Sequence, residues 1–456
     1  MASFTSLSFI FRFLPVFLIV YFLVPIRFRN IVTLVGSLVF YAMGDIKYLA
    51  LLVVLIPINY FLADASFKKK ATLDVETNLK RRRLFSICAI VLDVLVLAGF
   101  KIVATFINPA IFPLGLSFYI FKMISYQADV YKHAIKKRPT FVETAAYFSM
   151  FPQIAQGPIM RYSNSEALNM ETYGIERFEE GLRLFVIGLS MKVLLADRIG
   201  ILWDDVAMYG YDSVSCVLAW MGAFAYSFRL YFDFWGYSLM ASGILVIMGY
   251  KFIRNFDNPY ASCSISEFYR RWHMSLGEFF RDYVYFPLGG SRCEKKVMVR
   301  NLACVWLLTG IWHGNGLNFL VWGAVLGIFI ISEKLFYGSG LSKQPILGHV
   351  YVIVLIPVTW VIFAIGSMKD LGSFLMRLFP FFGTSNLVNP LDFVDYIKDY
   401  GILFVFAVVL CIPAVTKLYE RFKKSIVFSV VLLVLFWVSV YFCASSAANP
   451  FMYLNF

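Results

Sequence analysis

The sequence predicts an all-α polytopic membrane protein with about 11 transmembrane helices, and three observations support this class. Of the 456 residues, 60% are hydrophobic and only 15% are charged, against about 25% in ordinary soluble domains. The 48 Phe, 27 Tyr and 9 Trp residues are more than one soluble core would bury. Apolar stretches also recur along the whole chain, and a helix needs about 20 such residues to cross a bilayer. Disordered, collagen-like and disulfide-linked small proteins are therefore excluded.

The predicted spans begin with residues 9–25. No basic segment precedes this stretch and no small-residue cleavage site follows it, so we expect a retained span rather than a signal peptide. Several later stretches are too short to cross alone, so we also expect re-entrant or interfacial helices within a single membrane domain, residues 1–456. The other apolar stretches are residues 31–44, 47–65, 84–107, 111–131, 180–196, 214–232, 236–250, 301–313, 316–333, 347–366, 401–416 and 426–448.

The basic residues predict the orientation. Lys and Arg outnumber Asp and Glu by 41 to 28, and many of them lie in residues 66–83, 132–138 and 417–424. Cytoplasmic loops are enriched in Lys and Arg, so we expect these three loops in the cytoplasm and the N-terminus on the other side of the cell (inner or plasma) membrane. Binding of phosphate or lipid by these loops is the alternative.

Several common kinds of site have no signature in the sequence. The seven Cys residues lie far apart without a CxxC pair, so neither a disulfide framework nor a zinc site is indicated. We find no P-loop, nucleophile elbow, HExxH motif or dinucleotide-binding turn. No nucleic-acid-binding module is present either, so the positive net charge of +13 fits membrane loops rather than a nucleic-acid partner.

Residues 251–300 interleave nine basic and five acidic residues with aromatic ones. Ser264 and Glu267 fit a capping box, which satisfies backbone N–H groups where a helix begins. From Ile265 to Tyr283 apolar side chains recur at helical spacing, so we expect one amphipathic helix that ends near Pro287, at the membrane interface or packed under the spans.

Two histidines are candidate functional residues. His273 lies on this predicted helix. His313 lies between two apolar runs, where Gly314 and Gly316 would loosen the helix. A histidine exchanges its proton near pH 7, and an ionisable residue at membrane depth is a functional-site hypothesis by default. The alternatives are that His273 only forms hydrogen bonds at the interface and that His313 bridges two helices.

The remaining histidines, His133 and His349, lie in or just after polar segments, and we expect them to be bystanders. Gly323 and Gly327 stand four residues apart in an apolar stretch, which is typical of close helix packing.

Four further charges lie within apolar stretches. Arg229 and Asp233 are four residues apart, so we expect them to neutralise each other on one helix. Lys122 and Asp129 are seven residues apart on one face, where either would line a pore or extend to its edge.

The residues by themselves favour group transfer. A histidine in a membrane cavity can take the proton of a hydroxyl as that hydroxyl attacks a thioester or ester carbonyl. The competing class is a proton-coupled transporter that uses the histidines as relays. A transporter would show two halves of similar hydropathy, and we see none.

Several short motifs occur along the chain: Gly115-Leu116-Ser117-Phe118-Tyr119, Phe151-Pro152-Gln153, Gly157-Pro158-Ile159, Asn255-Phe256-Asp257-Asn258-Pro259-Tyr260, Ser266 to Leu276, Arg281-Asp282-Tyr283, Pro287 to Arg292, Trp312-His313-Gly314 and the closing Asn449-Pro450-Phe451 with Tyr453 and Phe456. In these motifs the sequence resembles the membrane-bound O-acyltransferase (MBOAT) family, and within it a bacterial branch that acts in alginate O-acetylation. The similarity runs from about residue 30 to the end and is densest over residues 226–323.

This resemblance implies a ring of spans around a central funnel, with His313 as the catalytic histidine and His273 as the second functional histidine. It implies an acyl donor that enters from the cytoplasm, acetyl-CoA, and no covalently bound cofactor. It also implies a polysaccharide acceptor and an extracytoplasmic partner of the SGNH-esterase type. The residues that we expect to bind substrate are Arg270, Arg271, Trp272, Arg281, Asp282, Trp312 and Asn315.

One segment departs from the family pattern, because Trp235 and Leu239 stand where close relatives usually have Ser and Asp. The Pro287 to Gly290 stretch favours polysaccharide acetylation over the sister activity, which transfers D-alanine to teichoic acid from a carrier-protein thioester. That sister activity stays the alternative.

Overall fold

The computed structural model describes residues 3–68, 74–162, 174–382 and 388–445, and every regular element in these ranges is a helix. The closing motif at residues 449–456 lies outside the described residues. The chain forms two compact units. The first consists of the described parts of Met1–Gly188, Tyr237–Ile253 and Cys443–Asn455, and the second of Leu189–Gly236 and Arg254–Phe442. The prediction of a single membrane domain stays a prediction.

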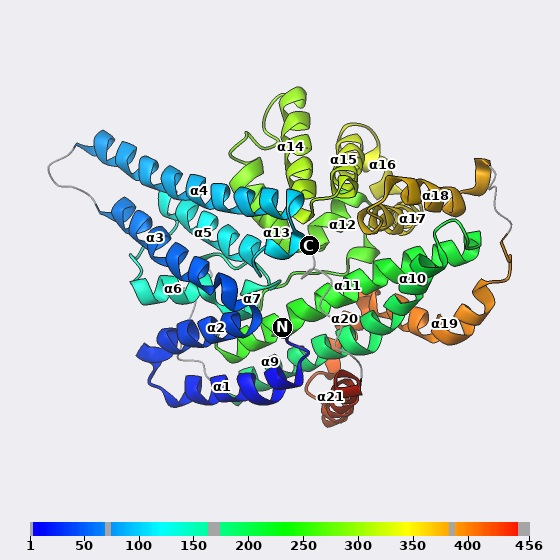
Figure 1. Ribbon diagram of the computed structural model, residues 1–456, viewed down its shortest axis with the longest axis horizontal. Coiled ribbons are helices and arrows are strands. Elements are labelled where there is room, and N and C mark those ends of the chain that lie inside the picture. The colour runs from blue at the N-terminus through cyan, green and yellow to red at the C-terminus, as the bar shows by residue number, and fades with distance from the viewer. Residues whose placement is uncertain (1–2, 69–73, 163–173, 383–387, 446–456) are drawn as a thin grey trace. The chain divides into compact units, whose positions relative to one another are not determined.

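The first unit contains three helices that lie side by side, α3, α4 and α5 (Figure 1). Polar side chains join them: Asn59 Nδ2 donates to Asp93 Oδ1 at 2.8 Å, and Gln127 Nε2 donates to Asn59 Oδ1 at 3.0 Å. The α-helices of this unit are α1 (Leu14–Leu23), α2 (Arg29–Asp45), α3 (Leu49–Phe67), α4 (Val75–Phe106), α5 (Leu116–Tyr131), α6 (Phe141–Ser149), α7 (Phe151–Ile154) and most of α9 (Ile175–Ser190).

Lys122 on α5 is buried in this first unit. Its ammonium group donates to Gln153 Oε1 at 2.8 Å and lies 4.4 Å from the centroid of the Tyr147 ring. Only 1% of Lys122 is exposed, so this side chain is held by partners inside the protein and does not extend to an edge.

The second unit contains most of the polar stretch that the sequence singled out. Helix α11 (Cys216–Ile247) contributes residues to both units. The other α-helices of the second unit are α10 (Asp197–Tyr209), α12 (Ile265–Arg271), α13 (Met274–Phe280), α14 (Lys295–His313), α15 (Leu317–Ser332), α16 (Gly338–Lys343), α17 (Pro345–Ala364), α18 (Met368–Leu378), α19 (Phe393–Leu410), α20 (Pro413–Phe422) and nearly all of α21 (Ile426–Ser445).

The helices confirm a multi-pass α-helical membrane protein. Six helical segments are long and apolar enough to cross a bilayer: Ile26–Phe67, Val75–Phe106, Cys216–Ile247, Leu317–Lys343, Pro345–Ala364 and Ile426–Ser445. The bent pair α19 and α20, with 78° between its halves, would make a seventh. Shorter apolar helices such as Phe9–Leu23 fall below this length, so the number of about 11 crossings stays a prediction.

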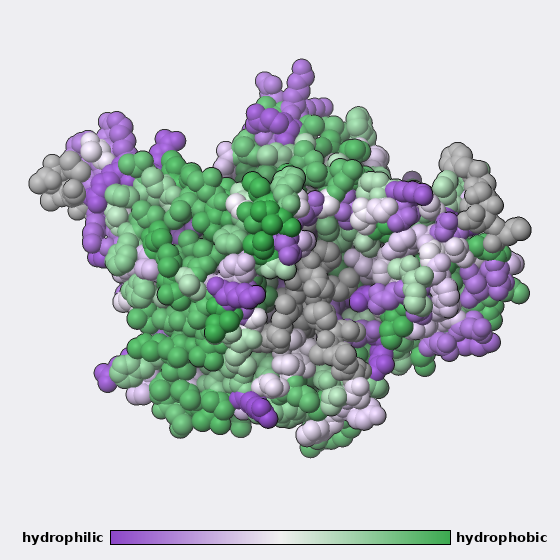
Figure 2. Space-filling model, in the orientation of Figure 1, coloured by the Kyte–Doolittle hydropathy of each residue, from purple (hydrophilic) through white to green (hydrophobic). Residues whose placement is uncertain are grey.

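The surface agrees with a membrane environment. In Figure 2 the visible face over α1 to α5 is largely hydrophobic, and hydrophilic residues gather at the tip of α14. In α1, α3 and α4 the residues Ile19, Val54 and Leu95 are each more than half exposed. Such large apolar faces are expected where lipid, rather than water, surrounds a protein.

Candidate active site

Helices α14 and α15 cross at very short range (Figure 1). A Cβ on Gly323 would stand 2.6 Å from the Trp306 carbonyl oxygen, and a Cβ on Gly310 would stand 2.6 Å from the Phe319 carbonyl oxygen. Glycine is thus required at both positions by close approach of the two backbones. The predicted packing role of Gly323 is confirmed, and the crossing fixes the end of α14.

We expect Gly323→Val to lower the thermal transition of the purified protein, because the added side chain would force α14 and α15 apart. Overpacking of this kind costs about 1–3 kcal/mol. Gly372→Ala is the matched control, since a Cβ there meets nothing within 4 Å and alanine favours a helix. Equal transitions for the two variants would contradict this interpretation of the crossing.

His313 is the last residue of α14, and the chain leaves the helix at Gly314. The imidazole lies among aromatic rings, with centroids 5.0 Å from Trp322, 5.2 Å from Phe363 and 4.6 Å from Trp312. Only 6% of the residue is exposed. The sequence placed His313 correctly at the break between two apolar helices.

The amphipathic helix predicted from Ile265 to Tyr283 is broken, which corrects the sequence-based expectation. Helix α12 ends at Arg271, and α13 begins at Met274. Between them His273 adopts a left-handed conformation with φ +45°, which costs a residue other than glycine about 1–2 kcal/mol. Such strained residues cluster at functional sites.

Residues 255–257 hold this break between α12 and α13. The Met274 N–H donates to the Asn255 carbonyl oxygen at 2.9 Å, and the Asp257 N–H donates to the Arg271 carbonyl oxygen at 2.9 Å.

The side chain of His273 is uncharged. Burial lowers the pKa of His273 to about 3, so its imidazole is neutral at pH 7.

One cavity of about 790 Å³ contains both histidines in its wall, and all of its lining residues belong to the second unit. Residues on one face of α14, from Leu302 to His313, line the cavity. Leu302 and His313 are 11 positions apart, so the cavity extends along the helix for about 16 Å at a rise of about 1.5 Å per residue. A cavity of this length suits an elongated ligand whose reacting end lies beside the histidines.

The predicted substrate-binding residues divide into two groups. Arg270, Trp272 and Arg281 line the cavity with the histidines. The others do not contribute to the lining: Arg271 pairs with Glu267 at 2.6 Å, Asp282 pairs with Arg281 at 2.7 Å, Trp312 packs beside His313, and Asn315 is exposed.

The cations of the cavity wall differ in their partners. The guanidinium of Arg281 is occupied by Asp282. Arg270 and Lys334, which also line the cavity, form no ion pair within the described residues. The three cations of the wall outnumber its two carboxylates, Glu278 and Glu333, which favours binding of an anionic group.

Sequence reasoning did not find Glu333, which is 5% exposed and lines the cavity. Its two carboxylate oxygens accept the N–H groups of Ile265 and Ser266 at 2.7 and 2.8 Å. The capping box is confirmed at Ser264, whose hydroxyl accepts the Glu267 N–H, but the Glu267 carboxylate accepts the N–H of Cys263 instead. Nothing near Glu333 in sequence indicates this distant helix start.

Aromatic rings connect the segment that departs from the family pattern to His313. Trp235 stacks on Tyr231 with centroids 5.1 Å apart, and the contacts continue through Trp272, Trp360 and Trp322. Trp235 therefore belongs to a series of aromatic contacts that reaches the cavity wall at Trp272 and Trp322.

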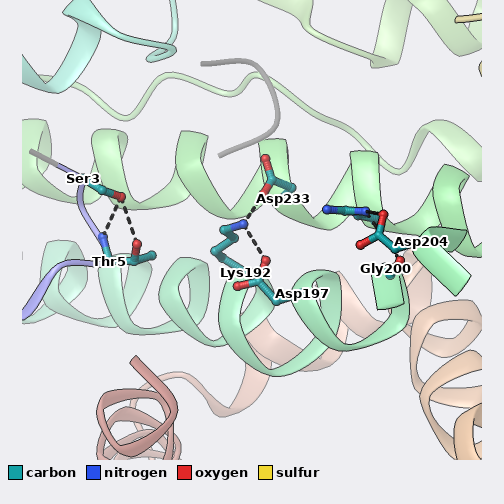
Figure 3. Close-up of polar contacts among 8 residues, drawn as sticks. Ser3, Thr5, Lys192, Asp197, Gly200, Asp204 and Asp233 are labelled. Atoms are coloured by element: carbon teal, nitrogen blue, oxygen red, sulfur yellow. Dashed lines mark hydrogen bonds and ion pairs between the residues drawn. The ribbon is translucent and has the colours of Figure 1, made fainter. Parts of the chain in front are cut away.

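The expected pairing of Arg229 with Asp233 is wrong, because other helices supply nearer partners (Figure 3). Arg229 pairs with Asp204 at 2.7 Å, and Asp233 pairs with Lys192 at 2.6 Å. Lys192 also pairs with Asp197 at 2.5 Å, so the charges are neutralised between helices rather than along α11.

The other two histidines do not line the cavity. His133 contacts Arg82, and His349 contacts the carbonyl oxygen of Ser262 and the thiol of Cys263. Among the described residues, no group of three or more His, Cys, Asp or Glu side chains converges as metal ligands would.

Comparisons with known proteins identify the family of this chain. The model of the membrane-bound O-acyltransferase family matches residues 33–375. The chain is 35% identical over 401 residues to a probable alginate O-acetylase of Pseudomonas syringae, covering 83% of this chain and 75% of the relative. It is 29% identical to a peptidoglycan O-acetyltransferase of Helicobacter pylori, over 99% and 97% of the two chains. A teichoic acid D-alanyltransferase of Bacillus subtilis is 27% identical over 49% of this chain and 59% of its own.

Proposed function

The chain belongs to the membrane-bound O-acyltransferase family and is an O-acyltransferase, and we propose that it moves an acetyl group from cytoplasmic acetyl-CoA across the membrane for O-acetylation of an extracytoplasmic polysaccharide. The observation that carries this proposal is that His273 and His313 line the same cavity. The membrane is then the cell membrane, and the N-terminus lies on the extracytoplasmic side.

The chemistry that we propose needs one general base. An acceptor hydroxyl attacks the thioester carbonyl, and His313 takes the hydroxyl proton as the new C–O bond forms. The C–S bond then breaks, and the departing thiolate receives that proton. The aromatic rings around His313 exclude water, which favours transfer over hydrolysis.

The unpaired cations support a phosphate-bearing donor. Arg270 and Lys334 line the same cavity as His313. Lys334 follows the end of α15, 12 positions beyond Trp322, whose ring contacts His313. A thioester carbonyl beside His313 would thus leave the phosphates of acetyl-CoA, which lie at the far end of its pantetheine arm, near Lys334.

We expect Arg270→Gln combined with Lys334→Gln to raise KM for acetyl-CoA about tenfold or more with little change in kcat, because each lost charge–phosphate contact weakens binding. KM for S-acetyl-pantetheine, which lacks phosphates, should stay unchanged. Arg254→Gln is the control, since Arg254 pairs with Asp257 and does not line the cavity. An equal rise in KM for both donors would contradict a phosphate role.

The acceptor is inferred from the relatives. Two relatives, which match 83% and 99% of this chain, are named for O-acetylation of alginate and of peptidoglycan, which supports a polysaccharide acceptor. An extracytoplasmic protein of the SGNH-esterase type would complete the transfer. The match to a teichoic acid D-alanyltransferase extends over only about half of this chain.

Acetate esters on exported polysaccharide test the proposal. Deletion of the gene should remove these esters, and the wild-type gene should restore them, whereas a gene that encodes His313→Ala should not. Unchanged esters in the deletion strain would overturn polysaccharide acetylation. Loss of D-alanine esters instead would establish the sister activity.

A further inference from the structure

The side-chain amide of Asn255 is placed to control the protonation of His273. Asn255 is 3% exposed. Its Oδ1 atom accepts the Ser275 N–H at 3.2 Å and the Ser275 hydroxyl at 2.9 Å, and it lies 3.1 Å from His273 Nδ1. A backbone N–H can only donate, so the atom that faces Ser275 N must be the amide oxygen. The orientation of the Asn255 amide is thereby fixed.

This orientation determines the tautomer of His273. An amide oxygen only accepts hydrogen bonds, so His273 Nδ1 must carry a hydrogen. The neutral imidazole has one N–H, which leaves the lone pair on Nε2. Nε2 is buried and has no hydrogen-bond partner within the described residues.

The ring and the backbone of His273 are held by the same short segment. The Asn255 carbonyl oxygen accepts the Met274 N–H and so supports the left-handed break, while the Asn255 side chain binds the ring. On another side the Phe234 ring meets the imidazole nearly edge-on, at 85° and 4.6 Å between centroids. His273 therefore has one ring orientation rather than a choice of two.

We infer that Asn255 is a positioning residue for acyl transfer, which holds His273 as the Nδ1–H tautomer so that Nε2 is the nitrogen that accepts a hydrogen bond or proton during the reaction. The catalytic part of this inference rests on the proposed function. The assignment of the His273 tautomer does not rest on the proposed function.

Nitrogen NMR of protein labelled with ¹⁵N-histidine tests the inference independently of activity. The chain has four histidines, and His273→Asn identifies the signal of His273. We expect the neutral Nδ1–H tautomer in the wild type. In Asn255→Asp the carboxylate accepts the same three hydrogen bonds, so Nδ1 should still carry a hydrogen. Asn255→Leu should shift this signal toward the other tautomer. An Nε2–H tautomer in the wild type would overturn the inference.

Kinetics test the catalytic part. We expect Asn255→Leu to lower kcat for acetyl transfer about 10- to 100-fold, as removal of an orienting partner typically does, with KM within about twofold. Asn255→Asp should keep most of the activity. If Asn255→Leu does not fold, Asn255→Asp alone decides, and a folded, inactive Asp variant would overturn the positioning role.

Asn301→Asp is the matched control. The Asn301 amide nitrogen donates to the carbonyl oxygens of Leu288 and Gly290, and a carboxylate cannot do so. This variant should be destabilised, whereas Asn255→Asp keeps an acceptor at the position of Oδ1. If the wild-type protein transfers no acetyl group, the proposed function is overturned. The tautomer of His273 is then still decided by the NMR experiment.

Discussion

His313→Ala is expected to lower acetyl transfer about 10²- to 10⁴-fold, the range typical of a lost general base. His313 ends α14, lies in the wall of the cavity and is enclosed by Trp322 and Phe363. The variant should still fold, because the glycine crossing of α14 and α15 is untouched. It should also bind acetyl-CoA with KM within about threefold, since the phosphate-binding cations are elsewhere.

His349→Ala is the matched control for His313. It removes an imidazole from the same unit, and His349 does not line the cavity. We expect transfer within about twofold of wild type. Normal transfer by a stable His313→Ala protein would exclude His313 as the base.

His273→Asn is expected to lower kcat about 10²-fold or more, because it removes the imidazole and retains the backbone. Asparagine tolerates the left-handed conformation that His273 adopts at φ +45° better than alanine does. A loss of activity can therefore be assigned to the ring rather than to a distorted break. Steady-state rates at saturating donor are the measurement.

The chain offers an unusually close control for this variant. His133 is also a left-handed histidine, with φ +58°, and it belongs to the first unit. His133→Asn makes the same substitution in the same conformation at a residue that does not line the cavity, and we expect it to leave transfer unchanged. If both variants lose activity equally, the effect of His273→Asn would not be specific to the cavity.

The sequence predicted the features that depend on local pattern. Apolar length gave the membrane class, and an ionisable residue between two apolar runs identified the helix break at His313. The spacing of Gly323 and Gly327 indicated a close helix contact, and the structure confirms it at Gly323.

Features that depend on distant partners were missed. The helical periodicity from Ile265 to Tyr283 continues across His273, so it could not reveal a break that Asn255 stabilises from 18 residues earlier. In the same way, Glu333 caps α12 from 67 and 68 residues away. Arg229 and Asp233 have suitable spacing for each other, but α10 and Lys192 offer nearer charges. Tertiary packing overrides local spacing in each case.

Purified protein in sealed vesicles provides the most direct test of the central claim, that the cavity transfers an acetyl group from a thioester to a hydroxyl. Labelled acetyl-CoA would be supplied on one side and a polysaccharide acceptor, with its SGNH-type partner, on the other. We predict alkali-labile labelled esters on the acceptor, with one free thiol released for each ester, and neither product with His313→Ala. Label that crosses the membrane without release of a thiol would contradict the account and indicate a transporter.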